Sequence, residues 1–471
     1  MGKLMQYVGT LIICNLCMCM GIMFAWPSST LRLFESANTT LHRPMTESEL
    51  ALFGSLSSIG ALLATPVVGI FMDHFGRKNS AVATSLLAVI SWAVIAASSR
   101  VEVLLSSMFV CGLSGAVFLI VPVYVSEICE ESIRGAMCSG TMIFYGVGML
   151  VSYLLGGCLQ YNMMIYICLA LTVISTLSLS FLRESPTCLM IKGMEKEAAM
   201  ALAFYRRLKP DSKEIQVELN NIKRSLNPEL DAITPEEEKQ LKPEKQSKEK
   251  MGIWRFIKKS SSTRAAIYMT LTLVTASIFQ GLVVIQVYAE PLFEEAIPTM
   301  SPSVCSMILA VIAIVAGLVA AYLTELAGRR PLMIYSSFVT GASCLLLGLQ
   351  LHLHWGPSWL VAANIYFFTT VYSLGGGTIP YVLIAEVFLP EVKSFMSMLV
   401  IEWAWLCNSI ILFIFNPLLR AIGLGPVFYI FAGVCMLTGV YSIFFVPETK
   451  GLSIDAIQNK LTKKKSHDVV Y

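Results

Sequence analysis

The chain has 471 residues, of which 56% are hydrophobic and only 14% charged, and its formal net charge is +3. Soluble domains carry about 25% charged residues, so this composition excludes an ordinary soluble protein and favours one with many membrane spans. The small net charge gives no reason to expect nucleic acid as a partner, and the lipid bilayer is the expected surrounding.

A helix needs about 20 apolar residues to cross the hydrocarbon core of a bilayer. Twelve stretches meet this requirement. They lie at about 5–26, 50–72, 79–98, 103–125, 137–158, 162–182, 265–288, 303–324, 332–350, 359–385, 395–415 and 426–446. The first stretch follows Lys3 without a convincing small-residue cleavage site, so we interpret it as a span rather than a signal peptide.

The distribution of lysine and arginine predicts the orientation of these spans, because cytoplasmic loops are enriched in both residues. Of the 34 cations, 30 fall on one side of the predicted membrane. The other side holds Arg32, Arg43, Arg100 and Arg420. We therefore expect both termini in the cytoplasm, in a multi-pass protein of the plasma membrane. Asn38, in the first outer loop, begins an Asn-Thr-Thr sequon and is a candidate glycosylation site.

One long polar segment separates six spans from six. The predicted divisions are an N-terminal six-helix bundle (1–187), a cytoplasmic helical linker (188–264), a C-terminal six-helix bundle (265–446) and a cytoplasmic tail (447–471). Within the linker, helices are expected at 195–207 and 214–224, with Pro210 ending the first. The charge-dense stretch 236–250 is expected to be mobile.

Charged motifs recur at matching places in the two halves. In the stretch 69–78, Asp73 lies three residues before Gly76, which two cations follow, and Glu325 stands in the same relation to Gly328. Glycine allows a tight turn, and the cations mark a helix end at the membrane surface. Further pairs are Glu127 with Glu386, Tyr124 with Tyr381, Arg134 with Lys393, and Glu184 with Glu448. Parallel six-helix halves of this kind place a substrate site between them near the midplane.

These motifs resemble those of the sugar porter family of the major facilitator superfamily, over essentially the whole chain. The matching segments are 69–78, 122–135, 377–390 and 447–452, and Trp26-Pro27-Ser28-Ser29 is similar to the branch that contains insect facilitated trehalose transporters. The resemblance implies an all-α membrane protein with twelve transmembrane helices in two pseudo-symmetric six-helix bundles, the major facilitator fold.

The family also implies a cytoplasmic gate, in which acids and cations form ion pairs between helices and hold the inner side shut. At the matching positions this gate consists of Asp73, Arg77, Glu127, Arg134, Glu325, Arg329, Glu386 and Lys393. Each exposed pair is worth about 1 kcal/mol or less, but a network can bias two states that differ by a few kcal/mol. The alternative is a set of solvated helix ends.

At the substrate site the chain departs from the family, whose ring of amides and indoles satisfies sugar hydroxyls. By spacing, the family's positions are occupied by Met142, by Ser277 with Ile278, by Val283, by Tyr381, and by Glu402 with Trp403. Gln280 shares a helical face with Ser277 and can replace part of a lost amide. Gln286 and Tyr288, the reference point for spacing in the seventh span, complete the candidate set.

Glu402 is the sharpest single signal, because an acid inside a span is costly and usually faces a cavity or a partner. Three interpretations remain open: a proton-coupling or cation-binding acid, a protonated hydrogen-bond donor that replaces an amide, and a residue that either pairs structurally or lies nearer the membrane edge.

The predicted function is a solute transporter that works by alternating access, with a sugar such as trehalose or a hexose as its small-molecule substrate. The alternatives are a proton-coupled or cationic solute carrier that uses Glu402, and a transporter-like sensor that binds ligand without moving it. The 13 cysteines lack metal spacing, so neither a metal nor another cofactor is expected. No nucleophile or phosphate loop indicates an enzyme. The oligomeric state stays open.

Overall fold

The structure, a computed structural model, describes residues 3–226, 260–388, 390–452, 456–457 and 459–460, without the side chains of 131, 225–226, 325, 385 and 390–394. Twelve helices in this part of the chain are long and apolar enough to span a membrane, as predicted. The charge-dense stretch 236–250 lies outside the described residues.

The N-terminal half begins with α1 (Leu4–Glu35). Its further helices are α2 (Glu47–Phe75), α3 (Arg77–Ala97), α4 (Val101–Leu113), α5 (Val117–Ile128), α6 (Glu131–Cys158) and α7 (Tyr161–Ser178). A 3-10 turn at Ser114–Ala116 joins α4 to α5 in one span. Three short helices follow, α8 (Pro186–Ile191), α9 (Glu195–Arg206) and α10 (Lys213–Leu226). The two helices predicted in the linker are thus confirmed, and α8 is an addition.

The C-terminal half repeats the pattern with more interruptions. Its helices are α13 (Ser261–Phe279), α14 (Leu282–Val287), α15 (Ala289–Ala296), α16 (Pro302–Ala327), α17 (Arg329–Leu353), α18 (Trp359–Leu374), α19 (Ile379–Val387), α20 (Pro390–Ile422) and α21 (Leu424–Phe445). The seventh span, predicted as one helix, breaks at Gly281, whose φ of 100° suits glycine. The tenth span is also interrupted, between Leu374 and Ile379, at three consecutive glycines, none of which has a positive φ.

The prediction that the first span ends near Trp26 is wrong, because α1 continues through Pro27 to Glu35. Trp26 is fully buried and packs edge-on against Phe53 and Trp92. Phe34, two turns further along the same helix, contacts Phe53 as well. This packing keeps the chain helical past a proline, whose lost hydrogen bond is tolerated more readily inside a helix bundle than in water.

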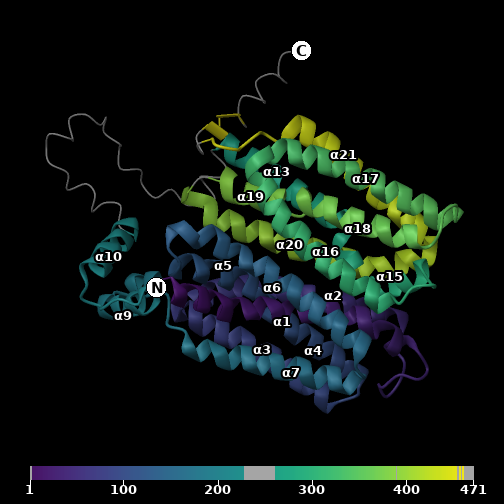
Figure 1. The fold of residues 1–471 in the computed structure, drawn as a ribbon, viewed down its shortest axis with the longest axis horizontal. Helices are drawn as coiled ribbons and strands as arrows, with labels where there is room; N and C mark the ends of the chain where they lie inside the picture. Colours follow the sequence, from purple (N-terminus) through teal and green to yellow (C-terminus); the bar gives the residue numbers. More distant parts are fainter. Residues whose placement is uncertain (1–2, 227–259, 389, 453–455, 458, 461–471) are drawn as a thin grey trace.

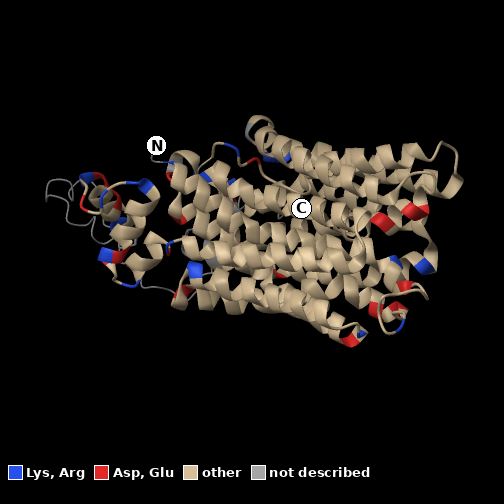
Figure 2. Ribbon diagram, turned by 60° about the horizontal axis from the view of Figure 1, so that its bottom comes forward, with Lys and Arg blue, Asp and Glu red and all other residues tan. Residues whose placement is uncertain are grey.

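The two halves lie side by side, the N-terminal half in purple to blue and the C-terminal half in green to yellow (Figure 1). Helix α2 packs on α20 and α6 packs on α16, so these four helices form most of the contact between the halves. The structure thus confirms two six-helix bundles. Charged residues gather at the two ends of the bundle, with a long and nearly uncharged band between them (Figure 2).

We call the end at which α1 begins and α8–α10 lie the linker end, and the other the opposite end. Helix α9 docks on the N-terminal half there: the Tyr205 hydroxyl lies 2.6 Å from that of Tyr124, and Arg206 donates to the Ile128 carbonyl at 2.8 Å. The linker thus begins as an ordered part of the N-terminal half.

Candidate functional site

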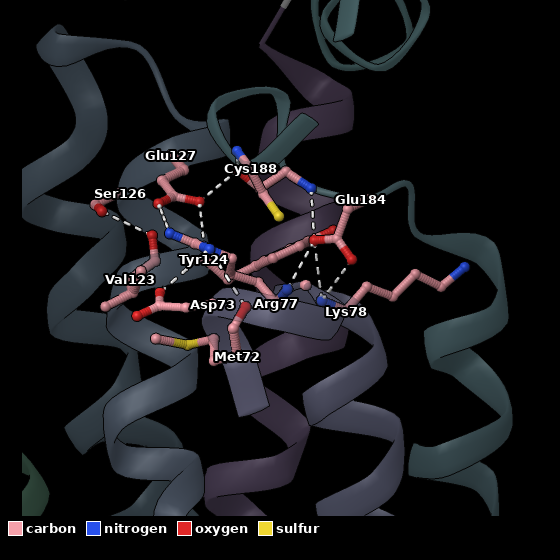
Figure 3. Close-up of polar contacts among 12 residues, drawn as sticks. Met72, Asp73, Arg77, Lys78, Val123, Tyr124, Ser126, Glu127, Glu184 and Cys188 are labelled. Carbon is pink, nitrogen blue, oxygen red and sulfur yellow. Dashed lines mark hydrogen bonds and ion pairs between the residues drawn. The ribbon is translucent and has the colours of Figure 1, made fainter. Parts of the chain in front are cut away.

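At the linker end of the N-terminal half, a buried arginine binds a carboxylate from another span. Arg77, the first residue of α3, donates through Nε and Nη2 to the two oxygens of Glu127 on α5, both at 3.2 Å (Figure 3). The side chains are only 9% and 13% exposed. Asp73, one turn earlier on α2, is a further partner at 3.7 Å but is 75% exposed. The fork of the guanidinium matches the carboxylate, so this contact fixes α3 against α5.

Glu184, just after the sixth span, caps the same corner. Its carboxylate accepts hydrogen bonds from the backbone amides of Arg77 at 2.9 Å and Lys78 at 3.1 Å (Figure 3). These amides lie at the start of α3, where the helix leaves its donors without partners and favours a negative charge. Gly76 has a φ of 106°, and a Cβ there would collide with this carboxylate. The glycine is therefore needed for both the turn and the cap.

The C-terminal half builds the same cluster from the repeated residues. Arg329, the first residue of α17, donates through Nη2 to Glu386 on α19 at 2.7 Å, and through its backbone amide to Glu448 at 3.1 Å. Gly328 again has a positive φ, of 88°, beside the Glu448 carboxylate. The corresponding hydroxyls of Ser185 and Thr449 donate to Glu127 and Glu386.

Burial by itself would raise the pKa of Glu448, but backbone amides donate to its carboxylate and lower that pKa below its usual value. The amides belong to Lys450, Arg329, Arg330 and Thr449. The carboxylate therefore stays ionised and caps the N-terminus of α17.

Each cluster connects helices of one half, and among the described residues neither forms an ion pair with the other half. Arg134 is exposed on α6, with no ion pair in the described part of the chain. The side chains of Glu325 and Lys393 lie outside the described residues. The repeat is thus visible as two matching clusters, and a gate that crosses between the halves stays a prediction.

Sequence reasoning noticed Glu184 and Glu448 as a repeated pair but left them out of the candidate gate. Their role as helix caps could not be read from the sequence, because the amides that they bind, at the starts of α3 and α17, lie 107 and 119 residues away along the chain. The match of Tyr124 with Tyr381 is not supported, since Tyr124 binds the linker while Tyr381 is 40% exposed. The spacing to the following glutamate, three residues in one half and five in the other, already differed.

The hydrogen bonds and ion pairs that join the two halves cluster at the opposite end, where sequence reasoning expected no site. Arg420 on α20 binds Glu35 at 2.8 Å and also Glu47, both in the N-terminal half. Arg32 on α1 binds Glu294 on α15 at 3.2 Å. We call these five residues, together with Ser28, Ser29 and Glu290, the seam. No repeated motif marks them. The signals in the sequence were that Arg32 and Arg420 are two of four cations on their side, and that Ser28 and Ser29 belong to a family-like segment.

Between the two ends, four aromatic rings pack across the contact between the halves. Trp405 on α20 stacks on Phe24 of α1, with ring centroids 5.7 Å apart and an angle of 14° between the planes. Phe118 and Tyr145, from α5 and α6, complete the group. This aromatic cluster combines spans from both halves, and it offers flat faces on which a sugar ring or an apolar ligand can stack.

The candidate residues of the seventh span separate into two groups. Ser277 and Gln280 are both buried and both face Gly376 at the break in the tenth span, as their predicted shared face requires. The Ser277 hydroxyl donates to the Gly376 carbonyl at 2.6 Å, whereas neither polar atom of the Gln280 side-chain amide has a hydrogen-bond partner among the residues that the structure describes. A buried amide in that condition is costly unless a ligand or water satisfies it.

The second group lies at the contact with the N-terminal half. The Tyr288 side chain is 2% exposed, and its hydroxyl donates to the Leu412 carbonyl at 3.1 Å. A Cβ on Gly54 of α2 would collide with that hydroxyl, so the Tyr288 ring packs directly against the N-terminal half. The backbone carbonyl of Gln286 accepts a hydrogen bond from Tyr153 at 2.5 Å, and Val283 is half-buried.

The remaining candidates lie near the aromatic cluster without joining it. Met142 is 62% exposed on α6, one turn before Tyr145. Trp403 is 39% exposed and donates to Thr275 of α13 at 2.7 Å. The ring of this helix that packs across the halves is Trp405, which lies two residues further on and points to a different face of the helix. Trp403 stays a predicted substrate-site residue.

Glu402 lies on the face of α20 that is directed toward the N-terminal half. It is four residues after Met398, whose sulfur faces Gly69 of α2, and three before Trp405. Its Oε1 is buried, with no hydrogen-bond partner in the described ranges of the chain. The interpretation of Glu402 as one member of an ion pair therefore has no support among the described residues, and the two interpretations that involve a proton or a ligand remain.

Comparisons with known proteins agree with this architecture. The family model described as sugar (and other) transporter matches residues 19–461. The facilitated trehalose transporter Tret1 of Culex quinquefasciatus is 24% identical over 453 residues, which cover 94% of this chain and 83% of that protein. Tret1 of Bombyx mori is 26% identical, with 89% of this chain and 80% of that protein covered. The inward open conformation of the xylose transporter XylE from E. coli superposes with a TM-score of 0.78 at 18% identity, covering 97% of this chain and 99% of that one.

Proposed function

The chain belongs to the family of sugar (and other) transporters, and on that premise we propose that it is a facilitator of trehalose or a hexose that works by alternating access. The observation that carries the proposal is the family match over residues 19–461, on a fold of two six-helix halves. In such a protein the halves rock against each other around a site near the midplane.

The two ends of the molecule have different parts in this cycle. The buried pairs Arg77–Glu127 and Arg329–Glu386 keep the helix ends of each half together, so each half moves as one body. The exposed pairs of the seam connect the halves and break when the opposite end opens. Each is worth about 1 kcal/mol or less, which suits a contact that must be made and lost in every cycle.

The predicted gate is retained in this proposal with a division of roles. Arg77, Glu127, Arg329 and Glu386 hold the clusters, while Asp73 and Arg134 are exposed at the linker end and are placed to meet the other half when that end closes. Glu325 and Lys393 are the corresponding positions of the C-terminal half. The supporting observation is that both clusters lie at the same end of the bundle.

The sugar binds at the aromatic cluster and the broken seventh and tenth spans. Trp405 and Phe24 stack on the sugar ring, and the unpartnered amide of Gln280 supplies a donor and an acceptor for hydroxyls. The other residues that we propose to line the sugar site are Ser277, Val283, Gln286, Tyr288, Met142, Tyr381 and Trp403. Sugar hydroxyls supply the hydrogen bonds that the buried side-chain amide of Gln280 lacks among the described residues.

The linker end faces the cytoplasm, with both termini on that side, and the opposite end faces outward at the plasma membrane. The excess of lysine and arginine at the linker end supports this orientation. Asn38 is exposed at the opposite end, which suits a glycosylation site on the outer side.

Uptake of labelled trehalose and hexoses into liposomes that contain the purified protein tests the proposal. We expect saturable uptake, reduced at least tenfold by Trp405→Ala and unchanged by Trp359→Ala, since Trp359 is 60% exposed at the end of a span. If no sugar enters while a known sugar porter is active in the same liposomes, the proposal is wrong. Binding without uptake would instead identify a sensor.

Glu402→Gln decides between the two open interpretations of Glu402. A protonated hydrogen-bond donor is replaced well by an amide, so uptake persists and does not depend on pH. A coupling acid cannot be replaced, so the variant loses uptake driven by a pH gradient while it keeps sugar exchange at equal pH on both sides. The same uptake measurement, with and without the gradient, distinguishes the outcomes.

A further inference from the structure

The acid Glu290 lies in the seam, at the point where the C-terminal half meets α1. Its backbone amide donates to the Ser28 hydroxyl at 2.8 Å, and its carboxylate accepts from the Ser29 hydroxyl at 3.1 Å. Ser303, at the start of α16, is a second hydroxyl partner of the carboxylate. The residue thus bridges both halves through hydroxyl groups alone, and among the described residues it has no lysine or arginine partner.

Two glycines at the end of α6 bring these hydroxyls into place. A Cβ on Gly156 would collide with Ser29, and a Cβ on Gly157 would lie 2.6 Å from the Cβ of Ser303. Because neither glycine has a side chain, α6 packs directly on both serines beside Glu290. The Glu290 side chain is half-buried there. Because Ser28 and Ser29 belong to the other half, this environment exists only while the halves are in contact.

The titratable groups that act on Glu290 are Glu294 on its own helix and Tyr153 on α6. Glu294 binds Arg32, and Glu35 lies between Arg32 and Arg420, so the other acids of the seam are paired with an arginine. The seam holds more acids than arginines, and Glu290 is the acid left without a cation.

Burial raises the pKa of Glu290, and the hydroxyls of Ser29 and Ser303 offset only part of that rise. A carboxylate in the open mouth would instead be solvated, with its usual pKa. The pKa of Glu290 is therefore higher in the closed form than in the open form, so the closed form binds a proton at Glu290 more tightly. By linkage, closure is then favoured as the pH falls through the raised value and disfavoured above it.

We propose that Glu290 is a proton-binding site on the outer side of the protein, and that a proton bound there stabilises closure of the outer mouth. The proton comes from the external medium, adds to the carboxylate and is released to the same side when the seam opens. A single site of this kind changes the ratio of closed to open forms by at most tenfold per pH unit. The proposal takes its sidedness from the proposed transport function.

The test measures closure itself, on purified protein without sugar. Spin labels at Ser99→Cys and Trp355→Cys report the distance between the halves at this end, in a background where the more accessible Cys138 and Cys158 are replaced by serine. Both label positions are exposed and lie away from the seam. We expect the short-distance population to rise several-fold between pH 8 and pH 5.

In Glu290→Gln we expect a closed population that is high and independent of pH, since the amide mimics the protonated acid. The matched control is Glu294→Gln, four residues later on the same helix, which loses the Arg32 pair but keeps the pH dependence. Unchanged pH dependence in Glu290→Gln, or its absence in the natural protein, would overturn the proposal.

A second variant keeps the test valid if Glu290→Gln does not fold. Ser29→Ala removes a donor to the charged carboxylate, so the midpoint of closure should move to higher pH; an unmoved midpoint contradicts the proposal. Sugar uptake is measured separately in liposomes. Uptake with pH-independent closure overturns the proton site alone, and pH-dependent closure without uptake overturns the sugar function alone.

Discussion

The two ends of this protein use charged residues in opposite ways. At the linker end, Arg77 and Arg329 are 9% and 8% exposed, and each binds a glutamate of its own half. At the opposite end, Arg32 and Arg420 are 50% and 43% exposed, and each binds a glutamate of the other half. The first contacts are duplicated in the repeat, whereas the second have no repeated counterpart.

This difference shows which contacts are permanent and which are made for one state. A buried ion pair is strongly destabilising to break, so it suits a joint inside a rigid half. An exposed pair is weak and screened by salt, so it suits a contact that opens during transport. The following substitutions test that division, from the largest expected effect to the smallest.

Removal of one partner of a buried pair should have the largest effect. Arg77→Met leaves Glu127 buried without its cation, which we expect to cost about 3–5 kcal/mol of stability. Arg329→Met should cost less, because Glu386 is 25% exposed and Glu127 only 13%. Thermal unfolding of the purified proteins measures both. The double variant Arg77→Met/Glu127→Gln should be more stable than Arg77→Met alone; a purely additive loss would contradict a buried pair.

The two helix-start glycines should come next. Gly76→Ala and Gly328→Ala force an alanine into a positive φ and against the capping carboxylate, at a cost of about 1–3 kcal/mol. Gly193→Ala is a matched control, since Gly193 has a φ of 76° but no atom within 4 Å of its would-be Cβ. If all three variants unfold at the same temperature, the caps contribute nothing beyond the backbone conformation.

Substitutions in the seam should have weaker effects. They should change the ratio of closed to open outer ends rather than the stability of the fold. Arg420→Gln removes two contacts between the halves, each worth about 1 kcal/mol or less, so the outer ends should separate more often. High salt should reduce the difference from the natural protein. Arg43→Gln is the control, because Arg43 binds Glu49 and Glu102 within one half. Spin-label distances between the outer ends of the two halves measure this separation. An equal response in both variants would show that contacts between the halves matter no more than contacts within one half.

The smallest expected effect is the loss of the stability contributed by Glu448 at low pH. The pKa of Glu448 is lowered in the folded protein, so its contribution to stability is present above its unfolded value of 4.5 and is lost as the pH falls through the lowered one. Glu448→Gln should therefore differ from the natural protein in unfolding temperature at pH 6, and the gap should narrow below pH 4.5. A gap that is constant down to pH 3.5 would show that the charge of Glu448 does not matter.

Much of the architecture could be predicted because it depends on local and periodic properties. The twelve spans follow from apolar length, and the clusters of the linker end from a motif that occurs twice. The length of α1 could not be predicted, because it depends on Trp26 and Phe34 finding partners on other helices. For the same reason the sequence did not reveal that Trp405 is the ring that meets Phe24.

By itself the sequence determined that the chain crosses the membrane twelve times, in two related halves with duplicated charged corners. Those features arise from hydrophobic length, charge placement and internal repetition, which are properties of neighbouring residues. Only the tertiary structure decided which residues connect the halves. Glu290, Ser29, Arg32 and Arg420 come from segments up to almost four hundred residues apart and share no repeated motif. Their proximity results from the packing of one complete bundle on the other, which no local pattern encodes.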